Sequence, residues 1–267
     1  MTLLSTVQLD AVEQLLRDVA RDVVMPRFQN LAAHEVKEKA ADDLVTIADQ
    51  ESEIRLSEGL SAIFPEASVV GEEACAADPA VQDRIGDGAV WIIDPIDGTG
   101  NFAAGRAPFG LMVALAVDGE VRAGWMFDPL GNRMCHARLG EGAFIDGTQV
   151  QSRPSGATLP IAGISVLFMD QDKRSRTIEA ASGKLEMVDI PRCAAEQYPR
   201  VVLGQNDMAL FERTLPWDHA AGVLFLIEAG GMALRLDGSP YNITDRRTGL
   251  LAAASPALWE AGARILS

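Results

Sequence analysis

The stretch WIIDPIDGTGNF, from Trp91 to Phe102, constrains the fold of this chain more than any other part of the sequence. Three apolar residues lead directly into two acids, Asp94 and Asp97, which bracket a proline and are followed by Gly-Thr-Gly. Such an apolar run predicts a short buried strand, and one aspartate is enough for the turn that ends a strand. Because an unpaired charge beside a buried strand is costly, the two acids indicate a binding site as well as a turn.

The rest of the chain alternates between helical and strand patterns, which predicts an α/β (α+β) fold with two sheets flanked by helices. The helical spacing over 7–28 predicts a helix that ends near Pro26, and further helices are predicted over 46–64, 171–181, from 216 onward and from 256 onward. Strands are predicted at 68–73 and 89–94, as a meander over 109–150, and at 162–168, 185–190, 232–238 and 250–255. A loop over 152–158 is the predicted boundary between an N-terminal domain, 1–152, and a C-terminal domain, 153–267.

Composition narrows the class of function. The formal net charge of -15 argues against nucleic acid as the main partner, because a phosphate backbone is bound by basic patches. We expect no membrane segment, because no apolar stretch reaches about 18 residues, and we see no signal peptide. Three cysteines without CxxC spacing predict reduced thiols in a cytoplasmic protein, with neither a disulfide framework nor a zinc site.

Acids follow the predicted strands or begin a predicted helix at several places. Glu72 and Glu73 follow VVG, Asp94 and Asp97 follow WII, and Asp218 opens a helix after LPW. If the two strands lie side by side, Glu72 and Asp94 meet at one sheet edge, where the carboxylates repel each other unless they are protonated or neutralised by cations. Oxygen ligands without histidine or cysteine favour Mg²⁺, or Mn²⁺, over zinc. Two such ions about 4 Å apart can activate water and stabilise a leaving oxygen in phosphoryl transfer.

The residues after Asp97 fit the same chemistry. Gly98 permits close backbone approach, and the amides of Gly98 and Thr99 are expected to face a phosphate at the start of a short helical turn. The Thr99 hydroxyl can hold an attacking water. A calcium loop of the EF-hand type is disfavoured, because the acids stand at positions 1 and 4 of the stretch and the twelfth position is Gly105.

Structural roles compete with these functional ones. Asp49 stands three residues after Thr46 and completes a capping-box pattern at a helix start. Asp218 lies in the first turn of a helix, where the dipole favours any acid. Asp97 with Gly98 is a common turn pair.

Three stretches, GEE at 71–73, WIIDPIDGTGNF at 91–102 and PWDHAAG at 216–222, resemble the signatures of the inositol monophosphatase family. This is a superfamily of lithium-sensitive, magnesium-dependent sugar-phosphate phosphatases. The resemblance extends to 42–50, 140–147, 236–242 and 249–261, and it is weakest over 159–211. It implies a layered αβαβα sandwich of the inositol monophosphatase/fructose-1,6-bisphosphatase type, and a homodimer.

The resemblance also implies roles for residues that match the family. The first metal would be held by Glu72, Asp94 and the carbonyl of Ile96, and the second by Asp94, Asp97 and Asp218. A third, weaker ion near Glu72 would help generate the nucleophile.

Asp49 and Thr99 would orient or deprotonate the attacking water, which is general-base work. No covalent phosphoenzyme is implied.

The chain departs from the family pattern at two places that bear on the substrate. The segment RCAAEQYPRVVLG, which begins at Arg192, replaces a GSAALDLC-like segment whose start lies along the substrate. Just before PWD the chain reads LFERTL, and Glu212 is the nearest candidate for the acid that contacts inositol hydroxyls in some relatives. Gly100 stands where the family often has threonine, which removes no ligand.

We therefore expect a Mg²⁺-dependent phosphomonoesterase that acts on a small phosphorylated metabolite, such as a polyol or sugar phosphate. Histidinol phosphate, adenosine 3',5'-bisphosphate, fructose 1,6-bisphosphate and NADP are alternative substrates within the same chemistry. A regulatory protein that keeps the fold without useful turnover is the alternative from another class, and a structural calcium-binding domain is disfavoured.

Overall fold

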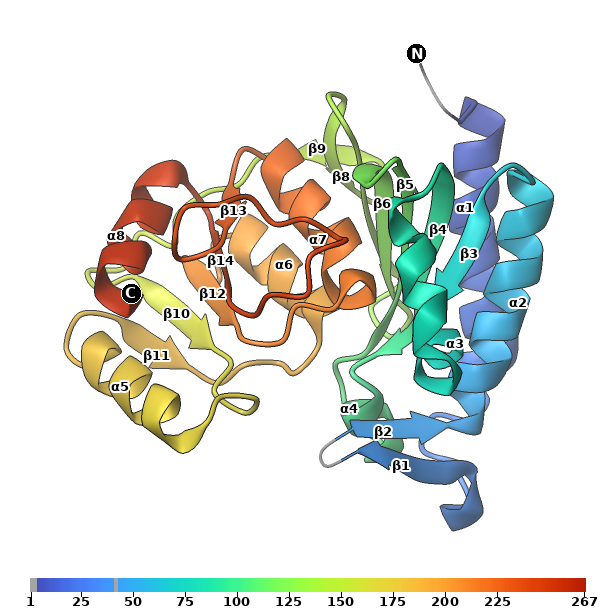
Figure 1. The fold of residues 1–267 in the computed structure, drawn as a ribbon, viewed down its shortest axis with the longest axis horizontal. Helices are drawn as coiled ribbons and strands as arrows, with labels where there is room; N and C mark the ends of the chain where they lie inside the picture. The colour runs from blue at the N-terminus through green and yellow to red at the C-terminus, as the bar shows by residue number, and fades with distance from the viewer. Residues whose placement is uncertain (1–3, 41–42) are drawn as a thin grey trace.

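The computed structural model of the protein describes residues 4–40 and 43–267, and it has five layers (Figure 1). Helices α1 and α2 form one outer layer and helices α5 and α8 the other, with α6 and α7 between two sheets. The predicted αβαβα sandwich is confirmed. The helices are α1 (Thr6–Val19), α2 (Ile47–Ile63), α3 (Glu72–Ala77), α4 (Thr99–Ala103), α5 (Gln171–Ala181), α6 (Ala194–Val202), α7 (Pro216–Glu228) and α8 (Pro256–Leu266). Shorter turns are a π-helix (Ala20–Val24) and two 3₁₀ helices (Ala33–Glu35 and Pro79–Gly86).

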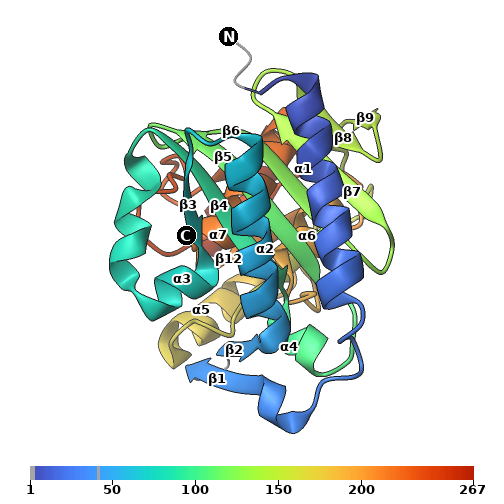
Figure 2. The same ribbon diagram turned by 90° about the vertical axis from the view of Figure 1, so that its right-hand side faces the viewer.

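The first sheet runs in the order β3-β4-β5-β6-β7-β8-β9. Its first two strands are parallel, and the others form the antiparallel meander that the turn signals predict. Figure 2 shows α1 and α2 lying across one face of this sheet. Its strands are β3 (Ser68–Gly71), β4 (Ala89–Asp97), β5 (Gly110–Val117), β6 (Glu120–Asp128), β7 (Arg133–Arg138), β8 (Gly142–Ile145) and β9 (Thr148–Val150).

The second sheet runs in the order β11-β10-β12-β14-β13 and lies between the α6–α7 layer and the α5–α8 layer (Figure 1). Its strands are β10 (Ile161–Ile164), β11 (Glu186–Val188), β12 (Met208–Phe211), β13 (Met232–Leu234) and β14 (Leu250–Ala253). A separate hairpin precedes α2 and consists of β1 (Val36–Ala40) and β2 (Asp43–Thr46). Within the described residues, no helix is both long enough and apolar enough to cross a bilayer.

Strand β4 is buried along most of its length because both of its faces are covered by helices. Trp91 and Ile93 pack in the core under α1 and α2, whereas Val90 and Ile92 pack in the core shared with α6 and α7. The unbroken apolar run of the opening motif therefore reflects a strand with no solvent face.

A β-bulge at the end of β4 decides where the two acids of the motif point. Asp94 lies opposite Met112 and Asp97 opposite Gly110, so three steps on β4 match two steps on β5. Residues three apart on a regular strand face opposite sides, and one extra residue restores the same side. Both carboxylates therefore face the α6–α7 layer, and the bulge also accommodates Pro95, which has no N–H for the ladder.

Several element boundaries differ from those predicted. The first helix is α-helical only to Val19 and continues as a π-helix to Val24, so the helical segment ends close to the predicted end near Pro26. The strand predicted at 162–168 ends at Ile164, and the next residues turn along a pocket. Helix α6 was not predicted because Pro199 lies inside it, and an internal proline argues against a helix.

The domain boundary predicted at residue 152 falls between the two sheets, since the first sheet ends at Val150 and the second begins at Ile161. Helix α7, from the second half, packs on the first sheet together with α6. The two halves therefore share the core around α6 and α7, and each half also has a core of its own.

Gly222 on α7 allows α6 and α7 to approach closely. A Cβ at this position would lie 2.0 Å from Cδ2 of Tyr198, whose side chain is fully buried. We predict that Gly222→Ala lowers the free energy of unfolding by about 1–3 kcal/mol, because the ring has no space to move. Gly100→Ala is the matched control, since its added Cβ meets nothing within 4 Å. Equal urea midpoints for the two variants would contradict the prediction.

Candidate metal centre

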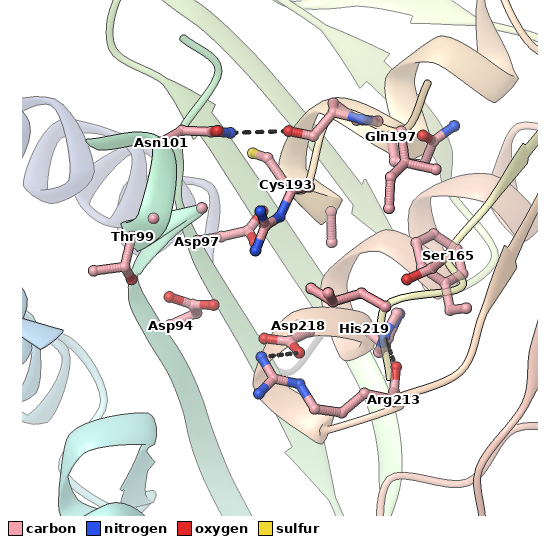
Figure 3. Close-up of a pocket in the computed structure, with 18 of the residues that line it drawn as sticks. Asp94, Asp97, Thr99, Asn101, Ser165, Cys193, Gln197, Arg213, Asp218 and His219 are labelled. Carbon is pink, nitrogen blue, oxygen red and sulfur yellow. Dashed lines mark hydrogen bonds and ion pairs between the residues drawn. The ribbon is translucent and has the colours of Figure 1, made fainter. Parts of the chain in front are cut away.

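A pocket lies where the ends of β3 and β4 meet the start of α7 and the second sheet. Its polar lining contains the carboxylates of Glu72, Asp94, Asp97 and Asp218. In Figure 3 the labelled carboxylates of Asp94 and Asp218 face the same space from β4 and α7. The structure thus brings together all four acids that the sequence predicts as metal ligands.

Three of these acids form the tightest group. Glu72, Asp94 and Asp218 each offer one oxygen atom, and these atoms lie within 4.8 Å of one another. Glu72 is adjacent to Asp94 because β3 and β4 pair in parallel, with Gly71 opposite Ile93. Asp218 lies in the first turn of α7, behind Pro216 at the first helical position, where the dipole favours an acid.

Glu53 of α2 fixes the start of the helix that carries Glu72. Its carboxylate accepts hydrogen bonds from the amides of Glu73, at 2.7 Å, and Ala74, at 2.8 Å. Any side chain at position 71 would collide with it, since a Cβ there would lie 2.2 Å from Cδ of Glu53. The glycine of the GEE motif is therefore required by this carboxylate. Glu53 was not predicted, although its place four residues after Asp49 puts both acids on one helix face.

Asp97 is held from the second half of the chain. Its Oδ2 accepts a hydrogen bond of 2.6 Å from the amide of Ala195 at the start of α6, and the Cys193 thiol also bonds to it. This contact joins the end of β4 to the segment that departs most from the family pattern. Asn101 adds a second link, because its Nδ2 donates to the carbonyls of Pro108, at 2.8 Å, and Pro191, at 2.9 Å.

The electrostatics of the pocket favour a bound cation. Burial, together with repulsion from Glu72 and neighbouring acids, raises the pKa of Asp94 well above its ordinary value. Burial and the charge of Asp218 raise the pKa of Asp97 to about 7, although the bond from Ala195 opposes this. A hard divalent ion held by carboxylate oxygens relieves both the desolvation and the repulsion. The three-acid group offers only carboxylate oxygens as ligands, with no histidine nitrogen or cysteine sulfur among them. The residues present therefore fit the predicted metal.

Asp49 performs the predicted capping role and contacts Thr99 at the same time. Its Oδ2 accepts hydrogen bonds from the Thr46 amide, at 2.8 Å, and the Thr46 hydroxyl, at 2.5 Å. Its Oδ1 accepts a bond of 3.0 Å from the Thr99 hydroxyl, which also lies 2.9 Å from the carbonyl oxygen of Ile96. Because a carboxylate has two oxygens, the two roles weighed from the sequence are compatible. Burial raises the pKa of Asp49 to about 7.

Gly98 and Arg192 lie beside each other on the pocket lining. Gly98 caps α4 with φ +84°, and a Cβ there would lie 3.1 Å from the Pro108 carbonyl oxygen and 3.4 Å from that of Arg192. Helix α4 begins at Thr99, as expected for the short turn after Asp97. Arg192 is exposed and also has a positive φ of 54°.

Glu212 was also predicted to contact substrate, but it does not belong to the residues that line this pocket. Its carboxylate accepts a hydrogen bond of 2.7 Å from Lys173 of α5. The next residue, Arg213, lines the pocket instead. Gln197 of α6 also lines the pocket. Neither Arg213 nor Gln197 is predicted from the sequence, because neither belongs to a motif.

The chain matches one family over nearly its whole length. The profile described as "Inositol monophosphatase family" matches residues 6–267. Inositol monophosphatase 1 of Bos taurus is 31% identical over 241 residues, which cover 85% of this chain and 83% of that protein. A protein of Thermotoga maritima named fructose-1,6-bisphosphatase/inositol-1-monophosphatase is 30% identical over 206 residues, or 77% of each chain.

The fold agrees with these matches. The crystal structure of inositol monophosphatase-II from Staphylococcus aureus superposes with a TM-score of 0.82 at 25% sequence identity, covering 98% of this chain and 94% of the other.

We predict that the metal-free protein becomes less stable as the pH rises from about 4 to about 7. The folded state binds more protons than the unfolded state over this range, because the folded pKa values of Asp49, Asp94 and Asp97 are raised. Between pH 5 and pH 8 the thermal midpoint should fall by on the order of 5 °C, and Mg²⁺ should restore most of the loss. Thermal melts with Mg²⁺ and with a chelator measure this.

The variant Asp97→Asn should reduce this pH dependence, whereas Glu58→Gln, at an exposed position, should leave it as in the wild type. A magnesium effect on the midpoint that is equal at pH 5 and pH 8 would show that the carboxylates do not bind the ion.

Proposed function

Since the chain belongs to the inositol monophosphatase family and is therefore a phosphomonoesterase, we propose that it hydrolyses the phosphate ester of a small polyol or sugar in a Mg²⁺-dependent reaction. One observation carries this proposal: the group of Glu72, Asp94 and Asp218 lies in the same pocket as Asp97 and Thr99.

The proposed metal ligands are those that the family resemblance implies, and this arrangement supports them. Glu72, Asp94 and the Ile96 carbonyl would hold one ion, and Asp94, Asp97 and Asp218 a second, with a third, weaker ion near Glu72. When bound, such ions supply positive charge that polarises the phosphoryl group and lowers the pKa of water.

Asp49 and Thr99 supply the route for the proton of the attacking water. The Thr99 hydroxyl donates to Oδ1 of Asp49, so its own oxygen presents lone pairs that can accept a hydrogen bond from water. Oδ2 of Asp49 is occupied by Thr46, which leaves Oδ1 for Thr99. A pKa of about 7 suits Asp49 to take a proton near neutral pH.

The phosphate would lie against the turn from Asp97 into α4. Gly98 keeps this backbone free of side-chain atoms, and Arg192 provides a positive charge on the adjacent lining. The polar donors of this turn would orient the phosphoryl group toward the water held at Thr99.

A regulatory protein without turnover remains the alternative from another class, and the complete set of acids weighs against it. Homodimerisation and lithium sensitivity stay predictions from the family resemblance.

We also propose a cytoplasmic location, which is supported by the three free, buried cysteines, Cys75, Cys135 and Cys193. Nucleic acid and membranes are not proposed as partners.

Phosphate release from a panel of esters tests the activity. The panel contains inositol 1-phosphate, histidinol phosphate, adenosine 3',5'-bisphosphate, fructose 1,6-bisphosphate and NADP. We expect turnover with Mg²⁺ and none with chelator, and Asp97→Asn should lower kcat/KM by about a hundredfold or more. A folded protein that binds Mg²⁺ but releases no phosphate from any ester would favour the regulatory alternative.

Thr99 variants test the proton route. We expect Thr99→Ala to lower kcat by about a hundredfold with little change in KM, because the hydroxyl acts on the water and not on binding. Thr99→Ser keeps a hydroxyl and should retain most of the activity. If Ala and Ser variants lose activity equally, the hydroxyl is not the acting group.

A further inference from the structure

One side of the pocket is formed where three parallel strands of the second sheet end. Strand β10 pairs in parallel with β11 and with β12, so the carboxyl ends of all three strands meet at one edge of the sheet. The apolar residues at or just beyond these ends line the pocket: Leu167 and Phe168 after β10, Ile190 after β11, and Phe211 at the end of β12. Ligands of open α/β sheets bind beyond the carboxyl ends of parallel strands. In Figure 3, Ser165 of this edge lies across the pocket from Thr99 and Asp94.

The four apolar side chains are not fully buried, and we call them the apolar wall. Phe168 is 40% exposed, and Leu167, Ile190 and Phe211 are half-buried. Apolar surface that gathers in a concave site is the usual lining for the apolar part of a ligand. The pocket therefore offers carboxylates for the proposed metal ions on one side and apolar surface for the rest of the ester on the other.

The ring of Phe211 is held in a fixed orientation. It stacks on the ring of Tyr198, with the centroids 5.3 Å apart and the planes at 22°, and it meets the ring of His219 edge to face at 4.7 Å. Tyr198 and His219 are almost fully buried, and a hydrogen bond of 2.8 Å joins the Tyr198 hydroxyl to Nδ1 of His219. A ring that is already fixed loses little conformational entropy when a second ring packs against it.

Phe168 is placed by contacts that its segment makes with α5. Arg174 of α5 donates hydrogen bonds to the carbonyls of Val166, at 3.1 Å, and Leu167, at 3.3 Å. The guanidinium carbon of Arg213 lies 4.5 Å from the centroid of the Phe168 ring and covers one face of it. Because Phe168 lines the pocket and is still 40% exposed, ring surface remains for a ligand.

The apolar wall is a poor environment for a bare polyol. Hydroxyl groups that lie against hydrocarbon lose hydrogen bonds to water and gain none in return. Glu212, the acid expected to contact such hydroxyl groups, is bonded to Lys173 and does not line the pocket. The residue before it, Phe211, lines the pocket instead.

We propose that the apolar wall binds an aromatic ring carried by the sugar or polyol part of the substrate, so that the preferred esters are sugar or polyol phosphates with an aromatic substituent. This inference rests on the proposed phosphatase function. The aromatic ring would pack against Phe168 and Phe211 while the phosphate lies on the side of the carboxylates, and the sugar or polyol would lie between them.

Two matched pairs of esters test the proposal at saturating Mg²⁺. Methyl and phenyl β-D-glucoside 6-phosphate share the sugar and the ester bond and differ only in the substituent, and glycerol 3-phosphate and its 1-O-benzyl ether form the second pair. The selectivity ratio is kcat/KM for the aromatic member divided by kcat/KM for the other. We expect a ratio of about ten in at least one pair, mainly through KM, because the ring buries apolar surface away from the reacting bond.

Variants of the two rings complete the test. Phe168→Ser should lower the selectivity ratio about fivefold, and because Phe168 is exposed this variant keeps the proposal testable if changes at Phe211 impair folding. Phe211→Leu keeps an apolar side chain but removes the ring, and should lower the ratio about threefold. Leu139→Ser is the matched control, since Leu139 is 41% exposed, lies between β7 and β8 and does not line the pocket, so the ratio should stay as in the wild type.

The outcomes separate this inference from the proposed function. If no ester of either pair, and none in the wider panel, is turned over, the proposed function has failed and the inference with it. If esters are turned over without preference for the aromatic member, the inference alone is overturned. It is also overturned if Phe168→Ser and Phe211→Leu lower kcat/KM equally for both members of each pair, because the apolar wall would then act on the common part of the substrate or on the fold.

Discussion

Repulsion between buried carboxylates is the constraint on which the rest of the structure depends. Asp94 and Asp97 are almost fully buried, and Asp218 and Glu72 reach the same pocket from other elements. Like charges in a poorly solvated space repel one another unless they are protonated or share a cation, so each carboxylate must be held in place by its own backbone. The protein meets this demand with rigid supports. A bulge aims the two acids of β4, the carboxylate of Glu53 fixes the start of α3, and the first turn of α7 presents Asp218.

The two halves of the chain contribute different parts of the site. The first half of the chain supplies most of the proposed metal ligands and the pair of Asp49, on α2, and Thr99, at the start of α4. The second half supplies Asp218 and the rim that includes Arg213. Because the amide of Ala195 bonds to Asp97, the segment that begins at Arg192 is attached directly to a proposed ligand. The position of this segment therefore affects the proposed ligand as well as the rim of the pocket.

The parts of the site that the sequence predicted are those set by local chemistry. A run of apolar residues ending in acids predicts a buried strand that presents carboxylates, and Asp218 after a proline predicts a helix start. Asp49 shows the limit of this reasoning, because the spacing from Thr46 fits a cap and the family motif fits catalysis. Only the positions of its two oxygens show that both contacts exist. Helix α6 was not predicted, because Pro199 argues against a helix in the sequence. Packing of α6 against α7 stabilises the helix in the structure despite this proline.

By itself, the sequence determined the fold class, most of the helices and strands, the family and the acids that gather at one pocket, because these follow from periodicity and from motifs short enough to act locally. Tertiary structure alone decided the remainder. The bulge that puts Asp94 and Asp97 on one face depends on pairing with β5, and the bond of Glu53 to α3 depends on how α2 packs. Arg213 lines the pocket and Glu212 does not, and this depends on the direction that the chain takes after β12. These are relations between residues far apart in the chain, and no local pattern records them.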